Sequence, residues 1–216
     1  MYQQGVEAGK ACAARLAGRL ARHRRPRRPA TPRHFALLAL AALVLCGAMA
    51  KTAEAQTRTL RFYYTHTGER LEVTYKRNGS FVPSALNELN RFLRDWRRNE
   101  STRMDPELFD LLWHVYNDVG AKEPIHVVSA YRSPATNNML RRRSRGVAKF
   151  SQHMAGKAID FFIPGVSSAR IREAAFRRQV GGVGFYPRSA SAFIHLDTGS
   201  VRSWPRMSRS QLERIF

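Results

Sequence analysis

His153, Asp160 and His195 are the residues of this chain whose types and spacing could hold a metal ion. His153 and Asp160 lie close together in the run Ser151-Gln-His-Met-Ala-Gly-Lys-Ala-Ile-Asp160, and His195 follows on a later segment. Two imidazoles and one carboxylate are the minimal protein shell of a catalytic zinc site, in which a fourth position stays open for water. Such a site would make the chain a hydrolase. Spacing alone also fits two unrelated histidines, one in a loop and one on a strand.

The segment before Asp160 predicts how the first two residues could meet. The apolar run 158–163 predicts a buried strand that would hold Asp160 rigidly. Gly156 permits a sharp turn between this strand and the loop that carries His153.

A second predicted strand, 192–196, would bring His195 to the same place. Residues i and i+2 of a strand point the same way, so His195 and Asp197 would project from one face. If that face meets Asp160, three donor groups converge. Asp197 would then either orient a ligand imidazole or act as the general base for the attacking water.

The rest of the pattern predicts an α+β fold in which helices flank a small, mostly antiparallel sheet that carries the site. Two β-rich runs, 59–64 and 71–75, predict a hairpin, and Asn78-Gly79 marks a further turn. Apolar residues at helical spacing run from Pro83 to Trp96. The other predicted elements are a helix capped by Asp105 and closed by Gly120, a strand at 125–129, helices at 134–143 and 168–178, and a glycine turn at 181–184.

Three further histidines of the predicted domain lack such partners. His66 falls in a turn and His114 on a helix, with no acidic or second imidazole partner at ligand spacing. His126 alternates with Ile125 and Val127, so it faces away from them. This pattern fits a structural or surface histidine, and it also fits a histidine that faces substrate.

The first 55 residues predict a secretory signal in front of a domain that spans 56–216. Residues 1–34 hold nine basic residues and one acid, an uninterrupted apolar run 35–45 follows, and two Ala-x-Ala sites come next. This apolar run is too short to cross a bilayer, which takes about 20 residues. We therefore expect export to the periplasm with the signal removed. An uncleaved anchor, a basic nucleic-acid-binding arm and a twin-arginine route stay open.

Cysteine usage and charge limit the class of protein further. Both cysteines, Cys12 and Cys46, lie in the signal region, so the mature domain would contain neither a thiol nor a disulfide. The formal charge of the chain is +21, of which the first 50 residues carry +8, leaving +13 for the rest. Such an excess attracts polyanions, and an exported protein meets the anionic cell wall first. The charges are not interleaved with aromatic residues as in a nucleic-acid platform. We expect a monomer without specific nucleic-acid binding, whose only membrane contact is transient and made through the signal.

The segment Ser151-x-His153-x-x-Gly156-x-Ala158-x-Asp160 resembles the zinc motif of the lysostaphin, D-alanyl-D-alanine peptidase and hedgehog group of metallopeptidases. The chain is still more similar to the bacterial YcbK-like murein endopeptidases, over about residues 59–204. The segments that carry this resemblance are Ala130-Tyr-Arg-Ser133, Arg143-Ser-Arg-Gly-Val-Ala-Lys149, Gly181-Gly-Val-Gly-Phe-Tyr-Pro-Arg-Ser189 and Ile194-His-Leu-Asp-Thr-Gly199.

The resemblance implies a zinc endopeptidase that hydrolyses the peptide cross-links of peptidoglycan during cell-wall remodelling. Zn2+ would be held by His153, Asp160 and His195. Arg132 would stabilise the oxyanion of the tetrahedral intermediate, or alternatively would hold its loop through a salt bridge. The remaining site residues would be Asp197 in catalysis and Tyr131, Ser151 and Tyr186 in substrate binding.

One position departs from the wider metallopeptidase group. Many of its members carry a glutamate base three residues before the last histidine, and here that position is Ala192. The base is therefore not carried over, and Asp197 or another group would have to serve. The departure also leaves an alternative function open, that of a zinc-stabilised protein that binds the cell wall without cleaving it.

Overall fold

The computed structural model describes residues 57–144, 146–189 and 191–216, and the predicted secretory signal lies outside them. The described part begins with the predicted hairpin, formed by β1 (Arg58–Tyr64) and β2 (Arg70–Arg77), which pair antiparallel. Asn78 and Gly79 have φ values of 51° and 77°, as a tight hairpin turn requires, and lead into the short strand β3 (Ser80–Phe81).

Two helices follow the hairpin at the predicted places. Helix α3 (Pro83–Phe92) starts on its proline, and α4 (Pro106–Asp118) is capped by the Asp105 side chain, which accepts a hydrogen bond from the Glu107 backbone N–H. The apolar pattern predicted that the first helix would continue to Trp96. It ends earlier because Asp95 forms an isolated β-bridge with Glu100.

The second half of the domain supplies the strands around the predicted site. In chain order its elements are β4 (Ile125–Ser129), α5 (Pro134–Arg143), β5 (Ala158–Phe162), α6 (Ser168–Arg177), β6 (Gly182–Tyr186), β7 (Phe193–Asp197), β8 (Arg202–Trp204) and α7 (Arg209–Glu213). Among the described residues, no helix combines the length and apolar character needed to cross a membrane.

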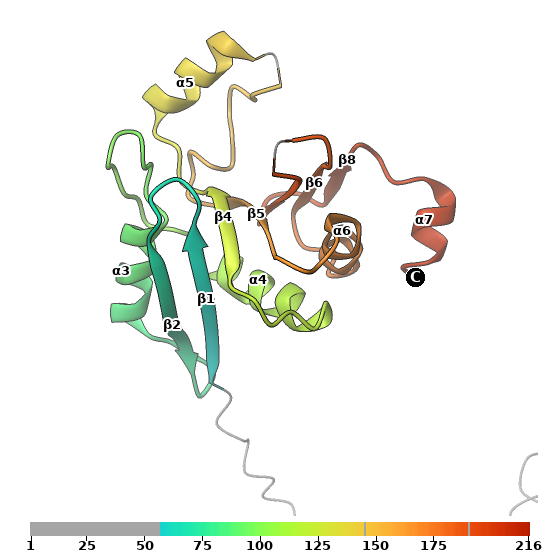
Figure 1. Cartoon of the computed structure of the whole chain (residues 1–216), viewed down its shortest axis with the longest axis horizontal. Coiled ribbons are helices and arrows are strands. Elements are labelled where there is room, and N and C mark those ends of the chain that lie inside the picture. Colours follow the sequence, from blue (N-terminus) through green and yellow to red (C-terminus); the bar gives the residue numbers. More distant parts are fainter. Residues whose placement is uncertain (1–56, 145, 190) are drawn as a thin grey trace, which may run out of the picture. The chain divides into compact units, whose positions relative to one another are not determined.

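All eight strands form one sheet in the order β3-β2-β1-β4-β5-β7-β6-β8 (Figure 1). Neighbouring strands are antiparallel except β1 with β4 and β6 with β8. The predicted α+β class with a mostly antiparallel sheet is confirmed. The sheet reaches eight strands because the N-terminal hairpin joins β4, while β6 and β8 extend the other side.

Strand β6 and strand β8 were not predicted, and the glycines of β6 explain why. Gly182 and Gly184 suggested a turn, but both lie on a strand against which large side chains pack. A Cβ on Gly182 would lie 2.6 Å from an Asp197 carboxylate oxygen, and one on Gly184 would lie 2.6 Å from the Trp204 ring. Glycine at these positions therefore makes room for neighbouring side chains.

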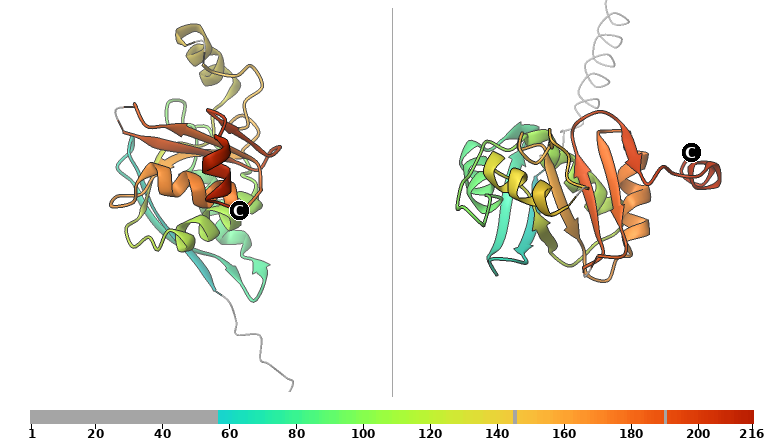
Figure 2. Two further views of the ribbon diagram at one scale, coloured as in Figure 1. Left: turned by 90° about the vertical axis from the view of Figure 1, so that its right-hand side faces the viewer. Right: turned by 90° about the horizontal axis from the view of Figure 1, so that it is seen from above.

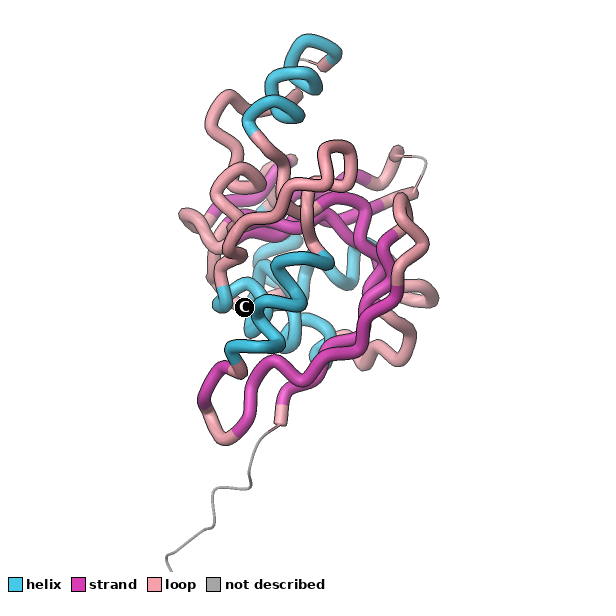
Figure 3. The backbone as a smooth tube through the Cα atoms, turned by 90° about the vertical axis from the view of Figure 1, so that its left-hand side faces the viewer, coloured by secondary structure: helices cyan, strands magenta, loops and turns pink. Residues whose placement is uncertain are grey.

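Helices α3, α4 and α6 pack on one face of the curved sheet, and the core lies between these helices and the sheet (Figures 2 and 3). Helix α3 packs on β2, α4 on β1, and α6 on β6 and β7. On β5 the alternation is clear, since Ile159 and Phe161 are fully buried in this core, whereas Asp160 and Phe162 are half-buried on the other face. The open face of β5 thus carries the carboxylate of the predicted metal site.

Candidate metal centre

Two adjacent strands and one loop bring the three predicted ligands together. Asp160 on β5 pairs directly across the ladder with His195 on β7, so both side chains project from the same face. His153 lies on the loop before β5. This loop turns at Gly156, whose φ is 68° and where a Cβ would lie 2.6 Å from the Arg103 carbonyl oxygen. Glycine is therefore required at this turn both by the positive φ and by the close approach of the Arg103 carbonyl oxygen.

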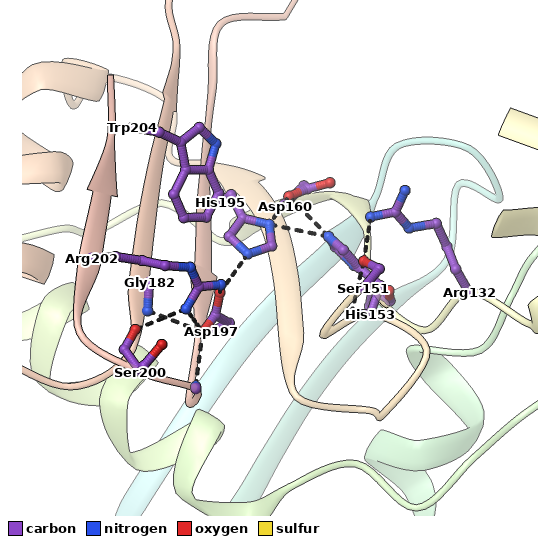
Figure 4. A network of polar contacts seen from close by, with 12 residues as sticks. Arg132, Ser151, His153, Asp160, Gly182, His195, Asp197, Ser200, Arg202 and Trp204 are labelled. Atoms are coloured by element: carbon purple, nitrogen blue, oxygen red, sulfur yellow. Dashed lines mark hydrogen bonds and ion pairs between the residues drawn. The ribbon is translucent and has the colours of Figure 1, made fainter. Parts of the chain in front are cut away.

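The three donor atoms form a triangle (Figure 4). His153 Nε2 lies 3.1 Å from His195 Nδ1 and 3.3 Å from Asp160 Oδ1, and His195 Nδ1 lies 2.8 Å from the same oxygen. Among the described residues, this is the group of histidine and acidic side chains close enough to hold a metal ion. A tetrahedral zinc ion with bonds of about 2.0–2.1 Å separates its ligands by about 3.3 Å, so the triangle has a suitable size.

Outer hydrogen bonds fix which ring nitrogens face the centre of the triangle. His153 Nδ1 lies 2.6 Å from the Ala130 carbonyl oxygen, and His195 Nε2 lies 2.9 Å from Asp197 Oδ2. Each outer nitrogen must donate to its oxygen, so in a neutral ring the inner nitrogen carries a lone pair. Two imidazole lone pairs and one carboxylate oxygen then point at one another, which is an unfavourable arrangement unless a cation lies between them.

The pKa values of the three groups differ for physical reasons. Burial lowers the pKa of His153, which keeps this ring neutral as a ligand must be. Burial also acts to lower the pKa of His195, but the hydrogen bonds that this ring donates to Asp160 and Asp197 outweigh burial, and the pKa is raised. Burial would raise the pKa of Asp160, yet His153 and then His195 hold it well below its usual range. The site thus favours positive charge beside an ionised carboxylate.

Asp197 lies behind His195 and faces away from the triangle. Its side chain is fully buried, and its oxygens accept hydrogen bonds from the backbone N–H groups of Gly182 (3.0 Å) and Gly199 (2.8 Å) and from Arg202 (2.7 Å). Burial acts to raise its pKa, but the hydrogen bond to His195 and those from Gly182 and Gly199 hold it at about 2. These contacts fit an orienting carboxylate, the first of the two roles that the sequence left open.

Arg132 lies on the other side of the triangle, at the wall of a pocket of about 470 Å³. Its backbone N–H donates to the His153 carbonyl oxygen, and its guanidinium donates to Ser151 Oγ at 3.3 Å. Its buried Nε has no hydrogen-bond partner among the described residues. Burial lowers the pKa of Arg132 from its ordinary value, though an arginine stays charged. A guanidinium held in this way at the pocket wall is suited to an anionic group bound in the pocket.

Two of the three predicted substrate contacts line this pocket. Ser151 and Tyr186 lie in its wall together with the three donor residues, while Tyr131 is absent from the lining and packs partly against the hydrophobic core. The Tyr186 hydroxyl accepts a hydrogen bond from Trp204 Nε1 at 2.6 Å.

The short strand β8 supplies two site residues that sequence reasoning missed. Trp204 lies against the His195 ring, with 4.9 Å between the ring centroids, and Arg202 pairs with Asp197. The spacing i and i+2 would have placed both side chains on one face of a strand, but glycine-rich neighbours hid that strand.

The other three histidines lie elsewhere in the domain. His66 stacks on Trp96, and His114 contacts Trp113 on α4. His126 faces away from the core, as predicted, and lies between the rings of Tyr63 and Phe162, with centroid distances of 4.8 and 4.9 Å. These contacts support the structural interpretation of His126.

Comparison with known proteins agrees with this geometry. Residues 52–204 match the model of the Peptidase_M15_2 family, described as Peptidoglycan L,D-endopeptidase MepK. The chain is 42% identical over 164 residues to the peptidoglycan L,D-endopeptidase MepK of Escherichia coli (strain K12), covering 76% of this chain and 89% of that protein. It is 43% identical over 157 residues to the probable peptidoglycan L,D-endopeptidase MepK of Haemophilus influenzae, covering 72% of this chain and 83% of that protein. The resemblance predicted from the motifs is confirmed, and the chain belongs to this family of peptidoglycan peptidases.

Proposed function

We propose that this protein is a zinc-dependent murein endopeptidase that hydrolyses peptide cross-links of peptidoglycan. The observation that carries the proposal is the triangle of His153 Nε2, His195 Nδ1 and Asp160 Oδ1, with edges of 2.8 to 3.3 Å. The donor set of two imidazoles and one carboxylate favours zinc. A zinc ion held there supplies Lewis-acid chemistry, since it polarises a carbonyl and acidifies water.

The chain's own residues would perform the remaining tasks. Arg132 would place its guanidinium charge where the oxyanion develops, in a pocket where such a group is worth more than in water. Asp197 would keep His195 in the tautomer whose Nδ1 lone pair faces the triangle. Ser151 would hold the Arg132 guanidinium in place, and Tyr186 would contact the substrate from the wall of the same pocket.

The names of the relatives support one type of cross-link as the substrate. Those proteins are described as L,D-endopeptidases. A link between D-alanine and diaminopimelate joins two D centres, whereas a link between two diaminopimelate residues joins an L centre to a D centre. We therefore propose the diaminopimelate-to-diaminopimelate link as the substrate of this chain.

The place of action is part of the same proposal. The basic, apolar and small-residue pattern of residues 1–55 supports export by a secretory signal, and residues 56–216 would act as a zinc peptidase domain in the periplasm. Peptidoglycan is the macromolecular partner that this compartment offers.

Muropeptide analysis by mass tests the activity directly. Incubation of the protein with purified cross-linked dimers should convert them to monomers, a chelator should stop the reaction, and added zinc should restore it. Persistence of the dimers at every pH, with about one zinc bound per chain, would favour the non-catalytic wall-binding protein instead.

A substitution separates the proposed role of Arg132 from metal binding. Arg132→Lys should lower hydrolysis by about a hundredfold while the bound zinc is retained, because a lysine does not reproduce the fixed donor. Arg188→Lys, at an exposed arginine of the same domain, is the matched control and should hydrolyse like the wild type. Equal activity of the two variants would remove Arg132 from the mechanism.

A further inference from the structure

Helix α5 and the loop that follows it form an arm beside the pocket. Figures 1 and 2 show α5 standing away from the rest of the domain. The chain returns from its end along the pocket, where Ser144, Gly146, Val147, Ala148 and Phe150 are among the lining residues. One wall of the pocket is therefore made by a segment that also reaches outward from the site.

The base of the arm is fixed by buried hydrogen bonds. Asp95 accepts hydrogen bonds from the Ser133 backbone N–H (3.0 Å) and from its hydroxyl (2.7 Å), and Ser133 caps α5 by accepting from the Thr136 N–H. The fully buried Asn137 donates to the Ala148 carbonyl oxygen at 3.1 Å and so ties the helix to the returning loop. The arm is thus held in place relative to the pocket.

The outer end of the arm is positively charged and exposed. Arg141, Arg142 and Arg143 end the helix, Lys149 lies in the loop, and the segment 133–152 contains no acidic residue. None of these four cations has an ion-pair partner among the described residues, in contrast to Arg58, Lys76 and Arg178. Phe150, beside Lys149, is 84% exposed.

Helix stability alone does not account for this arrangement. A cation in the last turn of a helix is favourable at the negative end of the dipole, but one side chain suffices for that. Three consecutive helical residues point about 100° apart, so the charges surround the end of the helix. The arm thus presents three cations at the end of the helix and, on the returning loop beside the pocket, Lys149 and the exposed ring of Phe150. These groups are suited to a polymer that carries several carboxylates and some apolar area.

We propose that this arm binds carboxylates of the peptidoglycan polymer that surround the cleaved cross-link, so that the protein favours the intact wall over small soluble fragments. The inference rests on the proposed function, because it places the arm beside the reacting peptide. Diaminopimelate residues carry free carboxylates, and attraction between several charges and a polyanion adds up and is screened by salt. Phe150 would add a contact that salt does not screen.

Binding to isolated sacculi tests the arm apart from hydrolysis. The triple variant Arg141→Gln, Arg142→Gln, Arg143→Gln should bind sacculi about tenfold more weakly than the wild type at low salt, and the difference should vanish at about 1 M salt. A variant with the same loss of charge at exposed positions, Arg77→Gln, Arg91→Gln, Arg170→Gln, is the control and should bind like the wild type. Thermal unfolding of both variants checks that they fold.

Chemical change of the wall identifies the groups that are bound. Sacculi whose free carboxyls have been amidated should bind the wild type as weakly as unmodified sacculi bind the triple variant. On amidated sacculi, the affinities of the wild type and the triple variant should be equal. Phe150→Ala should weaken binding by a smaller factor that persists at high salt. If the triple variant loses binding to phosphatidylglycerol vesicles but not to sacculi, the partner is a membrane and the inference is wrong.

Failure of the arm and failure of the proposed function give different results. If the triple variant binds and hydrolyses sacculi like the wild type, the arm has no such role although the peptidase activity stands. If the wild type binds sacculi more tightly than the triple variant but cleaves no cross-link, the binding role of the arm is supported and the proposed peptidase activity is contradicted. If both hold, the ratio of sacculus hydrolysis to hydrolysis of soluble dimers should fall in the triple variant.

Discussion

Two carboxylates of this domain with little exposed surface, Asp110 and Asp160, lie in opposite electrostatic situations. Asp110 accepts hydrogen bonds from Arg58 (2.8 Å), Lys76 (2.5 Å) and the Tyr75 hydroxyl (2.8 Å), so the chain itself supplies its counter-charges. Asp160 faces two imidazole nitrogens whose outer partners leave lone pairs toward it. The first cluster is complete without any ligand, whereas the second becomes complete when a cation joins it.

Loss of one ligand breaks the second cluster and has the largest expected effect. His153→Ala should reduce the bound zinc from about one per chain to almost none and should bring dimer hydrolysis below detection, because two donors do not hold zinc in a structured site. Zinc content is measured by elemental analysis, and hydrolysis is measured by mass spectrometry of the muropeptide products. His114→Ala, at a histidine on α4, is the control and should keep both properties. Full zinc binding by His153→Ala would contradict the assigned ligand set.

Removal of the Asp110 charge breaks the first cluster and should lower stability without touching the metal. Asp110→Asn leaves Arg58 and Lys76 without their shared counter-ion, and we expect a loss of about 2–4 kcal/mol in the free energy of unfolding. Urea denaturation measures this loss. Asp118→Asn removes a more exposed ion pair with Arg178 and should cost less than about 1 kcal/mol. Equal losses in the two variants would show that the Asp110 cluster contributes no more to the free energy of unfolding than an exposed ion pair does.

The carboxylate behind His195 distinguishes orientation from charge. Asp197→Asn places an amide where His195 Nε2 donates, which favours the tautomer with its proton on the ligand nitrogen. We expect zinc affinity to fall about 10–100-fold. Competition with a chromophoric chelator measures the affinity, and circular dichroism checks the fold. Unchanged affinity combined with lost hydrolysis would instead support Asp197 as the general base.

The dependence of stability on pH tests the Asp110 cluster further. Of the effects predicted here for substitutions and pH, we expect this one to be the smallest. Burial acts to raise the pKa of Asp110, but hydrogen bonds from Lys76, Tyr75 and Arg58 together lower it below the ordinary carboxyl value. The unfolded chain therefore takes up the proton first, so the contribution of Asp110 is complete above about pH 4 and is lost as pH falls through the depressed folded value. The stability difference between wild type and Asp110→Asn, followed by urea denaturation from pH 7 to 3, should shrink. A constant difference would contradict this account.

Much of the fold and of the site could be predicted because local signals and the motif agreed. Pro83, Asp105 and the Asn78-Gly79 turn mark real element ends, and Asp160 and His195 lie on two of the predicted strands, which pair directly with each other. The sequence could not reveal that Asp197 is enclosed by Gly182 and Arg202, since these contacts depend on the pairing of β6 with β7 and β8. The strand β6 was not predicted for a related reason. Its glycines are required by the close approach of side chains that lie far away in the sequence.

The direct pairing of Asp160 with His195 makes the centre a property of strand register. A slip of one residue between β5 and β7 would send one of these side chains into the core and would replace it with an apolar neighbour, such as Ile159 or Leu196. The segment between β5 and β7 contains α6 and β6. The loops of this segment do not affect the register between β5 and β7. Insertions at those loops would lengthen the chain without moving the ligands, whereas a single-residue insertion within either strand would abolish the site.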